Sequence, residues 1–327
     1  MVIAVDVTGG DYFPENPVKG ALLALEENSE LTVLLVGPSA LIEKELQRHA
    51  YDASRVRTLD APEIITMDDA ASAALKTKTQ SSITVGITAH KNGACDGFVS
   101  AGNTGALLAA STFILGKLPG VSRPTIAAAF PTIKGVRLLI DAGANLELKP
   151  EMYLQFSRMA TVFLKRIMHV DDPKVGLVNV GSEAEKGTDT HRQAYELLSR
   201  LDNFVGNIEG KDILYGKADV ILTDGFTGNV LLKFGESIPD VLKMMIGKAL
   251  KEANADAAAQ KMMIDILTSS LQSFNYEHVG GVPFLGVNGI SFVGHGGSSP
   301  TAIKNMILRA AECIKHGLND KIVSALQ

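Results

Sequence analysis

The chain has 327 residues, of which 46% are hydrophobic and 20% charged, so it can bury a large core. A net charge of −5 and the absence of Trp argue against a general nucleic-acid binder. The only cysteines, Cys95 and Cys313, stand outside any CxxC or Cys/His cluster, which argues against a zinc site or a disulfide framework.

Apolar runs of strand length alternate with amphipathic segments along the chain. In chain order we expect a strand at 1–7, a helix at 14–27, a strand at 31–36, a helix at 38–49, a strand at 56–59, helices at 68–78 and 82–92, a strand at 97–101 and a helix at 104–118. There follow strands at 125–130 and 136–140, a helix at 150–168, a strand at 174–180, a helix at 191–201, strands at 204–208 and 219–223, a helical region at 230–273 broken near Asn254, a strand at 290–293 and a helical region at 299–326 broken near Gly317. This alternation predicts a doubly wound, mostly parallel sheet, with 125–130 and 136–140 as an antiparallel hairpin.

No low-complexity linker divides the chain, so residues 1–327 are expected to form a single α/β domain or two intimate lobes. The stretch at about 238–273 has apolar stripes and interspersed lysines, and it is expected to protrude as a helical hairpin. Such a hairpin either packs on a dimer mate or lies with its tip on anionic lipid. The uncharged stretch 97–116 is interrupted by polar and small residues and predicts a core helix, so we expect a cytoplasmic protein.

Four short segments share one pattern, in which small residues follow an apolar strand and lead into a helix. They are Ser100–Gly105, Asp141–Asn145, Asp224–Asn229 and Gly294–Ser299. Small residues let backbone N–H groups approach a ligand, and helix N-termini add unpaired donors and partial positive charge. The four turns predict an anion-accepting site at the carboxyl ends of strands, and an enzyme that acts on a phosphate or acyl group.

Three carboxylates, those of Asp6, Asp141 and Asp224, each end an apolar strand. They could bind Mg²⁺ or orient a lysine, but turn formation by the side chain is the favoured explanation. Because no Asp-x-Asp pair or metal-spaced cluster accompanies them, we expect neither a metal nor another cofactor.

Amide and hydroxyl side chains stand at the helix starts, where capping alone would account for them and ligand contact is compatible with it. The candidates for binding substrate and phosphate are Asp6, Gly9, Gly10, Asn103, Thr104, Asp141, Asn145, Asp224, Thr227 and Gly296.

The catalytic candidates are Lys186, His295 and Asn229. Lys186 follows a strand end and is either a cation for phosphate or the oxyanion, or a solvated loop lysine. His295 follows the last apolar strand and either donates to phosphate or the carbonyl, or is a hydrogen-bonded histidine at a strand end.

Six motifs occur in a fixed order along the chain: Asp6–Asp11, Ser100–Ala106, Asp141–Asn145, Gly206–Gly210, Asp224–Asn229, and Gly286–Gly289 with His295-Gly296. Together they resemble the bacterial phosphate acyltransferase family, the PlsX proteins of phospholipid synthesis, from residue 1 to about residue 308. The chain departs from the family pattern at Val7 and Thr8, where the family usually has Ala and Met, at Ser182, where it has Glu, and in the run after His295.

The resemblance implies a Rossmann-like, three-layer α/β/α sandwich, similar to isocitrate dehydrogenase and phosphotransacetylase folds. It also implies a reaction in which a fatty acyl group moves from acyl carrier protein to orthophosphate, giving acyl phosphate for phospholipid synthesis. A homodimer and weak peripheral association with the inner face of an anionic membrane are implied as well.

The chemistry of this reaction makes few demands on the protein. Orthophosphate is about half dianion at neutral pH, with a second pKa of ~6–7, and the thiolate leaving group has a parent pKa of ~8.5. The protein therefore has to hold phosphate, align the thioester and stabilise the oxyanion, without a nucleophile of its own. Two alternatives are an NAD-dependent dehydrogenase, whose Gly-x-Gly-x-x-Gly pattern is absent, and a non-catalytic adaptor for the carrier protein or the membrane.

Overall fold

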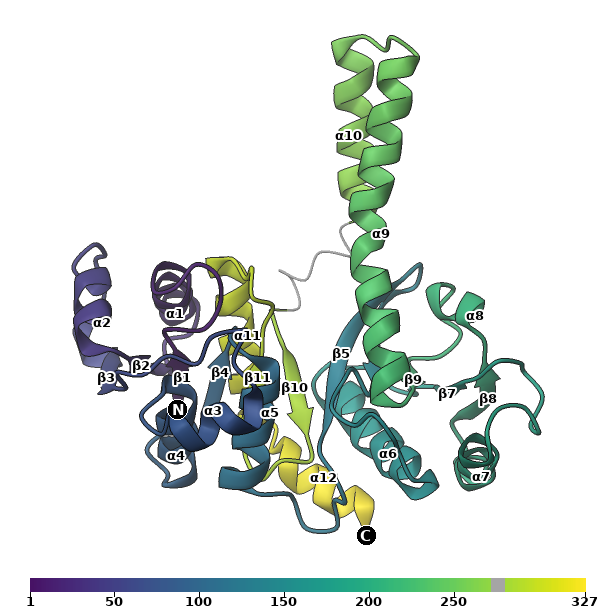
Figure 1. The fold of residues 1–327 in the computed structure, drawn as a ribbon, viewed down its shortest axis with the longest axis horizontal. Helices are drawn as coiled ribbons and strands as arrows, with labels where there is room; N and C mark the ends of the chain where they lie inside the picture. Colours follow the sequence, from purple (N-terminus) through teal and green to yellow (C-terminus); the bar gives the residue numbers. More distant parts are fainter. Residues whose placement is uncertain (272–279) are drawn as a thin grey trace.

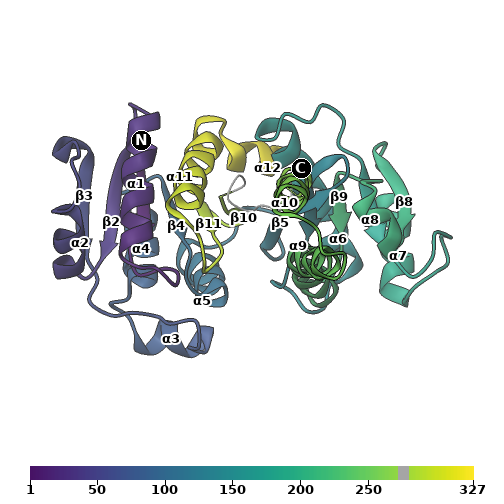
Figure 2. The ribbon, with the colours of Figure 1, turned by 90° about the horizontal axis from the view of Figure 1, so that it is seen from above.

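The computed structural model describes residues 1–271 and 280–327, in which one twisted sheet lies between two layers of helices (Figures 1 and 2). The strands are β1 (Val2–Asp6), β2 (Thr32–Gly37), β3 (Val56–Asp60), β4 (Gly97–Ser100), β5 (Thr125–Thr132), β6 (Gly135–Ile140), β7 (Val175–Val178), β8 (Phe204–Ile208), β9 (Val220–Leu222), β10 (Val282–Leu285) and β11 (Ile290–Val293). Their order across the sheet is β3-β2-β1-β4-β11-β10-β5-β6-β9-β7-β8.

Two groups of parallel strands make up most of this sheet. The first group is β3, β2, β1, β4 and β11, and the second is β6, β9, β7 and β8. Between them, β10 runs antiparallel to both β11 and β5, and β5 runs antiparallel to β6. The predicted mostly parallel sheet and its antiparallel hairpin are therefore confirmed.

The helices divide between the two faces of the sheet. They are α1 (Glu15–Glu27), α2 (Ser39–Leu46), α3 (Ala71–Thr77), α4 (Ser82–Lys91), α5 (Thr104–Ala110), α6 (Pro150–Arg166), α7 (Asp189–Leu198), α8 (Gly210–Leu214), α9 (Gly225–Glu252), α10 (Ala257–Ser270), α11 (Pro300–Lys315) and α12 (Leu318–Leu326). One apolar core unites the sheet with α1, α2, α6, α7, α11 and α12. A second core, with α3, α4, α5, α8 and the start of α9, covers the other face, which gives the three layers expected.

The long helical region breaks where the sequence predicts a break. Helix α9 ends at Glu252, Asn254 takes a positive φ of 49°, and α10 begins at Ala257. The resulting hairpin projects from the body of the molecule (Figure 1). Its predicted last residues, 272–273, lie outside the described residues.

Among the described residues, the strand β10, the short helix α8 and the 3₁₀ turn at Ala53–Arg55 were not predicted. Helix α5 is also shorter than predicted, because a π-helical turn at Ser111–Leu115 takes over from it. In the described part of the chain, no helix combines the length and the apolar character needed to cross a membrane.

Candidate functional site

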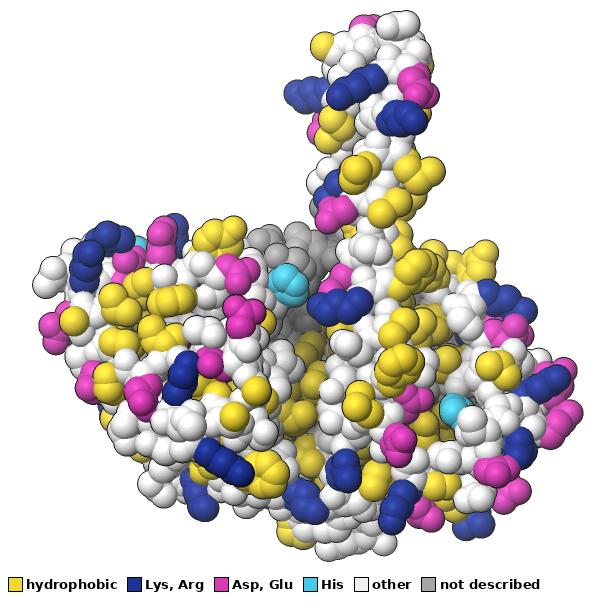
Figure 3. All heavy atoms as spheres, viewed as in Figure 1, with side chains coloured by type: hydrophobic (Ala, Val, Ile, Leu, Met, Phe, Trp, Pro, Cys, Tyr) yellow, Lys and Arg dark blue, Asp and Glu magenta, His cyan; other side chains and the backbone are white. Residues whose placement is uncertain are grey.

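A groove lies between the two halves of the sheet, at the base of the helical hairpin (Figure 3). Its volume is about 1100 Å³, the size of a cavity that takes a long or bulky ligand. All four small-residue turns contribute to its lining. The residues they supply are Gly102, Thr104, Gly105, Ala142, Gly143, Asn229, Gly294, His295 and Gly296.

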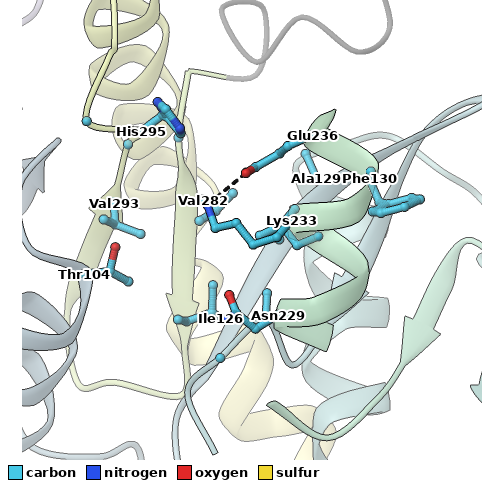
Figure 4. A pocket seen from close by; sticks show the side chains of 18 of the residues that line it. Thr104, Ile126, Ala129, Phe130, Asn229, Lys233, Glu236, Val282, Val293 and His295 are labelled. Atoms are coloured by element: carbon cyan, nitrogen blue, oxygen red, sulfur yellow. Dashed lines mark hydrogen bonds and ion pairs between the residues drawn. The ribbon is translucent and has the colours of Figure 1, made fainter. Parts of the chain in front are cut away.

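The floor of the groove is apolar. Ile126, Ala128 and Phe130 alternate along β5, Val282 lies on the neighbouring strand β10, and Val293 of β11 is paired with Val282 (Figure 4). Strand side chains alternate between the two faces of a sheet, so the three β5 residues point to the same side. Such a floor suits a hydrocarbon chain.

One face of α9 forms a wall of the groove and carries its charges. Asn229, Lys233, Glu236, Asp240 and Lys243 recur every three or four residues and all line the groove. Lys233 Nζ lies 2.8 Å from a carboxylate oxygen of Glu236, whereas Lys243 Nζ lies 3.7 Å from one of Asp240.

The opposite wall carries Thr104, at the start of α5, and His295, in the loop after β11 (Figure 4). The Nδ1 atom of His295 accepts a hydrogen bond of 3.1 Å from the backbone N–H of Gly297, which fixes the ring beside the loop. In Figure 4 Lys233 reaches from α9 over Val282 toward the side that holds His295. A cation and a histidine therefore face one end of an apolar floor.

The loop after β1 packs against the loop that carries His295 and is hydrogen-bonded to it. Asp11 lines the groove, and its backbone N–H donates to the Gly296 carbonyl at 2.8 Å. Gly10 has a φ of +95°, and a Cβ there would lie 2.8 Å from the same carbonyl oxygen, so only glycine permits this approach. Gly9 is packed in the same way, since a Cβ on it would lie 2.9 Å from the backbone nitrogen of Gly102.

Asp6 is buried below these loops and is bonded to them. Its carboxylate accepts hydrogen bonds from Ser100 Oγ at 2.6 Å and from the N–H and Oγ1 of Thr8 at 3.0 Å each. Burial raises the pKa of the Asp6 carboxyl, and the hydrogen bond from Ser100 works in the opposite direction. Asp6 does not line the groove, so its geometry is that of a residue that positions the loops.

Asp141 positions the loop after β6 through hydrogen bonds, as Asp6 positions its own neighbouring loops. Its carboxylate accepts hydrogen bonds from the backbone N–H groups of Ile126, Ala144 and Asn145, and from the Asn145 side chain at 2.8 Å. Burial raises the pKa of the Asp141 carboxyl, while the Asn145 side chain lowers it. Asn145 also donates to the Pro124 carbonyl, so neither residue reaches the groove.

Capping engages three further candidates. The side chain of Asp224 accepts from the N–H and the hydroxyl of Thr227, at 2.7 and 2.9 Å, and so caps α9. The Oδ1 atom of Asn103 caps α5 through the Ala106 N–H, and its amide nitrogen donates to carbonyls of the 66–69 loop. These side chains are bonded to the protein itself, in keeping with the capping alternative.

Lys186 lies away from the groove. It is exposed in the loop after β7, where its carbonyl accepts from the Asn179 side chain at 3.0 Å. It is absent from the lining, so the geometry of the groove gives its predicted catalytic role no support. Two lysines of α9, Lys233 and Lys243, line the groove instead, and neither was among the predicted site residues.

Nothing in the local sequence singles out Lys233 and Glu236. A lysine and a glutamate three residues apart are typical of a solvated helix face. Lys233 could have been found only from Asn229 and the helical period together, because Asn229 was already a candidate and Lys233 lies one helical turn further along the same face. Within the described residues, 1–271 and 280–327, no group of three or more His, Cys, Asp or Glu side chains is placed to hold a metal ion.

A protein family model and two similar proteins agree on the family of this chain. A protein family described as "Fatty acid synthesis protein" matches residues 1–321. The chain is 45% identical over 331 residues to a phosphate acyltransferase of Salinibacter ruber, with 99% of this chain and 98% of the relative covered. It is 42% identical over 337 residues to a phosphate acyltransferase of Chlorobaculum parvum, with 100% and 99% covered.

Among solved structures, a phosphotransacetylase from Streptococcus pyogenes superposes with a TM-score of 0.63 at 16% sequence identity. The alignment covers 96% of this chain and 94% of the other, which supports the three-layer α/β/α fold. The family match and the relatives lead to one conclusion: the chain belongs to the fatty acid synthesis protein family and is an acyltransferase.

Proposed function

We propose that the protein transfers a fatty acyl group from acyl carrier protein to orthophosphate, giving an acyl phosphate for phospholipid synthesis. The observation that carries this proposal is the groove, whose apolar floor lies between Lys233 and Asn229 on one wall and His295 on the other. An acyl chain would lie over Ile126, Ala128 and Val282, with its thioester between the two walls. The names of the relatives supply the acceptor, since they are called phosphate acyltransferases.

The polar groups match what the transfer needs. Lys233 supplies positive charge for phosphate, and His295 stands across the groove as a donor to the thioester carbonyl. Donors placed where charge develops on the carbonyl oxygen lower the barrier to attack. No covalent intermediate on the protein is required, because phosphate is itself the nucleophile.

Purified protein given palmitoyl-acyl carrier protein and phosphate tests this function. Acyl phosphate and free carrier thiol are expected in equal amounts, with a rate that rises with phosphate concentration. Thioester cleavage that is independent of phosphate would indicate a hydrolase, and no cleavage would favour an adaptor.

We further propose that the protein acts as a homodimer and associates peripherally with membranes. Support comes from the exposed apolar residues of α9 and α10. Near the body these are Phe226, Val230 and Phe234, with exposed fractions of 66%, 54% and 66%. Toward the hairpin tip they are Val241, Met244, Met245, Met262, Met263, Ile264 and Ile266. The part near the body would meet a second copy, and the tip would lie on lipid, with the hairpin lysines at the headgroups.

The double variant Met262→Glu, Met263→Glu should lose co-sedimentation with anionic liposomes while keeping its activity in solution, because two carboxylates on the tip oppose insertion. A matched control, Ile133→Glu with Val180→Glu, adds the same charges to exposed apolar positions on the body. It should sediment like wild type. If the tip variant also sediments like wild type, the tip does not insert, and if it loses its dimer or its solution activity, the hairpin is structural.

A further inference from the structure

Lys233 and Glu236 form an ion pair inside the groove, and this pair suits one kind of oxyanion. Lys233 Nζ donates to Glu236 Oε2 at 2.8 Å, and both side chains line the cavity. Both are also open to water, with exposed fractions of 62% and 39%. An ion pair in such surroundings contributes little to stability, so a ligand can rearrange it at small cost.

A carboxylate beside the cation is unexpected in a site for a plain anion. Glu236 would repel a dianion, and it also competes with that dianion for the ammonium group of Lys233. The repulsion becomes attraction only when the ligand carries a proton that the carboxylate can accept. With a second pKa of about 6–7, phosphate at neutral pH is a mixture of H₂PO₄⁻ and HPO₄²⁻, and both forms still carry a proton, whereas sulfate has none.

We propose that Lys233 and Glu236 together select phosphate over unprotonated oxyanions, an inference that rests on the proposed function. Lys233 donates to a deprotonated phosphate oxygen, and Glu236 accepts a hydrogen bond from the phosphate O–H. Asn229, one helical turn before Lys233 on the same wall, is placed to donate to a further oxygen.

The arrangement is consistent with the balance of the reaction. A deprotonated phosphate oxygen attacks the thioester carbon, a C–O bond forms, and the C–S bond breaks. The dianion HPO₄²⁻ gives up its proton to the departing thiolate, so the products are the acyl phosphate dianion and the free thiol. Glu236 holds that proton by a hydrogen bond until the thiolate needs it and is unchanged at the end.

The test compares phosphate with sulfate. In Glu236→Gln, the ratio of the sulfate inhibition constant to the phosphate KM should fall by about 10- to 100-fold, the scale of one hydrogen bond to a charged group. Lys233→Ala should raise the phosphate KM by a similar factor and leave the KM for acyl-acyl carrier protein unchanged, and Lys233→Arg should restore most of the phosphate affinity. The matched control is the exposed ion pair between Lys304 and Glu27, 2.6 Å long and absent from the groove lining, broken by Lys304→Ala or Glu27→Gln.

The outcomes separate the two proposals. If Glu236 only orients Lys233, Glu236→Gln weakens phosphate and sulfate equally, and the selectivity inference is overturned. If the variants match the control in both constants, the pair does not bind the anion. If wild type forms no acyl phosphate, the proposed function fails, and calorimetric titration of phosphate and sulfate into wild type, Glu236→Gln and Lys233→Ala still decides whether the pair selects between them.

Discussion

Gly228→Ala is expected to lower the free energy of unfolding by about 3 kcal/mol or more and to abolish acyl transfer. Gly228 lies buried in the first turn of α9, and a Cβ on it would overlap the Asp141 carbonyl and lie 2.5 Å from Thr223 Oγ1. Both neighbours are fixed, since the Thr223 hydroxyl donates to the same carbonyl at 3.1 Å. Overpacking a site that cannot relax costs roughly 1–3 kcal/mol and sometimes more. The added methyl group would also push α9, and with it Asn229 and Lys233, away from the groove.

The matched control is Gly247→Ala on the same helix, where a new Cβ has no heavy atom within 4 Å. Alanine favours a helix by about 1 kcal/mol over glycine, so this variant should be as stable as wild type or slightly more so. Chemical denaturation of both variants gives the comparison. A Gly228→Ala protein with wild-type stability and activity would show that α9 is not held against the loop after β6 in the way described.

Val282→Trp is expected to reduce kcat/KM for long-chain acyl donors by about 10²-fold. Val282 is half-buried in the floor, between the wall with Lys233 and the wall with His295 (Figure 4). An indole ring there would occupy the space proposed for the chain. Displacing four methylene groups at about 0.8 kcal/mol each gives roughly 3 kcal/mol, or about 10²-fold.

Chain length provides the internal control for this variant. A short-chain acyl donor should keep most of its rate, because its few methylenes do not extend over the blocked floor, and Val282→Ile should behave like wild type. The chain has no other Trp, so fluorescence of the new indole also reports whether an acyl ligand reaches the groove. Equal losses for long and short donors would place the acyl chain elsewhere.

The strands could be predicted from the sequence where apolar runs were continuous. The prediction missed one central strand, β10. β10 carries Pro283 and is flanked by Gly281 and Gly286, a composition that argues against a central strand. Yet it pairs with β11 through Val282 and Pro283 and with β5 through Phe284 and Leu285. Each half of this short strand therefore pairs with a different neighbour. This pairing depends on the tertiary fold and has no signal in the local sequence.

The candidate site divides in a similar way. The four turns were found because strand, small residues and helix follow one another locally, and all four border the groove. Which side chains face the ligand depends on contacts across the sheet. The carboxylates of Asp6 and Asp141 accept hydrogen bonds from neighbouring loops, and Lys186 lies on a loop outside the groove lining.

Lys233 shows the opposite case. Its surroundings in the sequence are those of an ordinary helix surface, and it enters the groove only because α9 packs beside β5 and β6. The opposite wall of the groove, with His295, comes from a loop more than 60 residues later in the chain. Local pattern therefore predicts the turns of the site but not its charged wall.

Transfer of the acyl group to phosphate is tested most directly with labelled phosphate. Protein mixed with palmitoyl-acyl carrier protein and ³²P-orthophosphate should form a labelled, hydroxylamine-sensitive acyl phosphate in step with the release of carrier thiol. Lys233→Ala should need a higher phosphate concentration for the same rate. Release of free fatty acid without labelled acyl phosphate at any phosphate concentration would contradict the proposed transfer to phosphate.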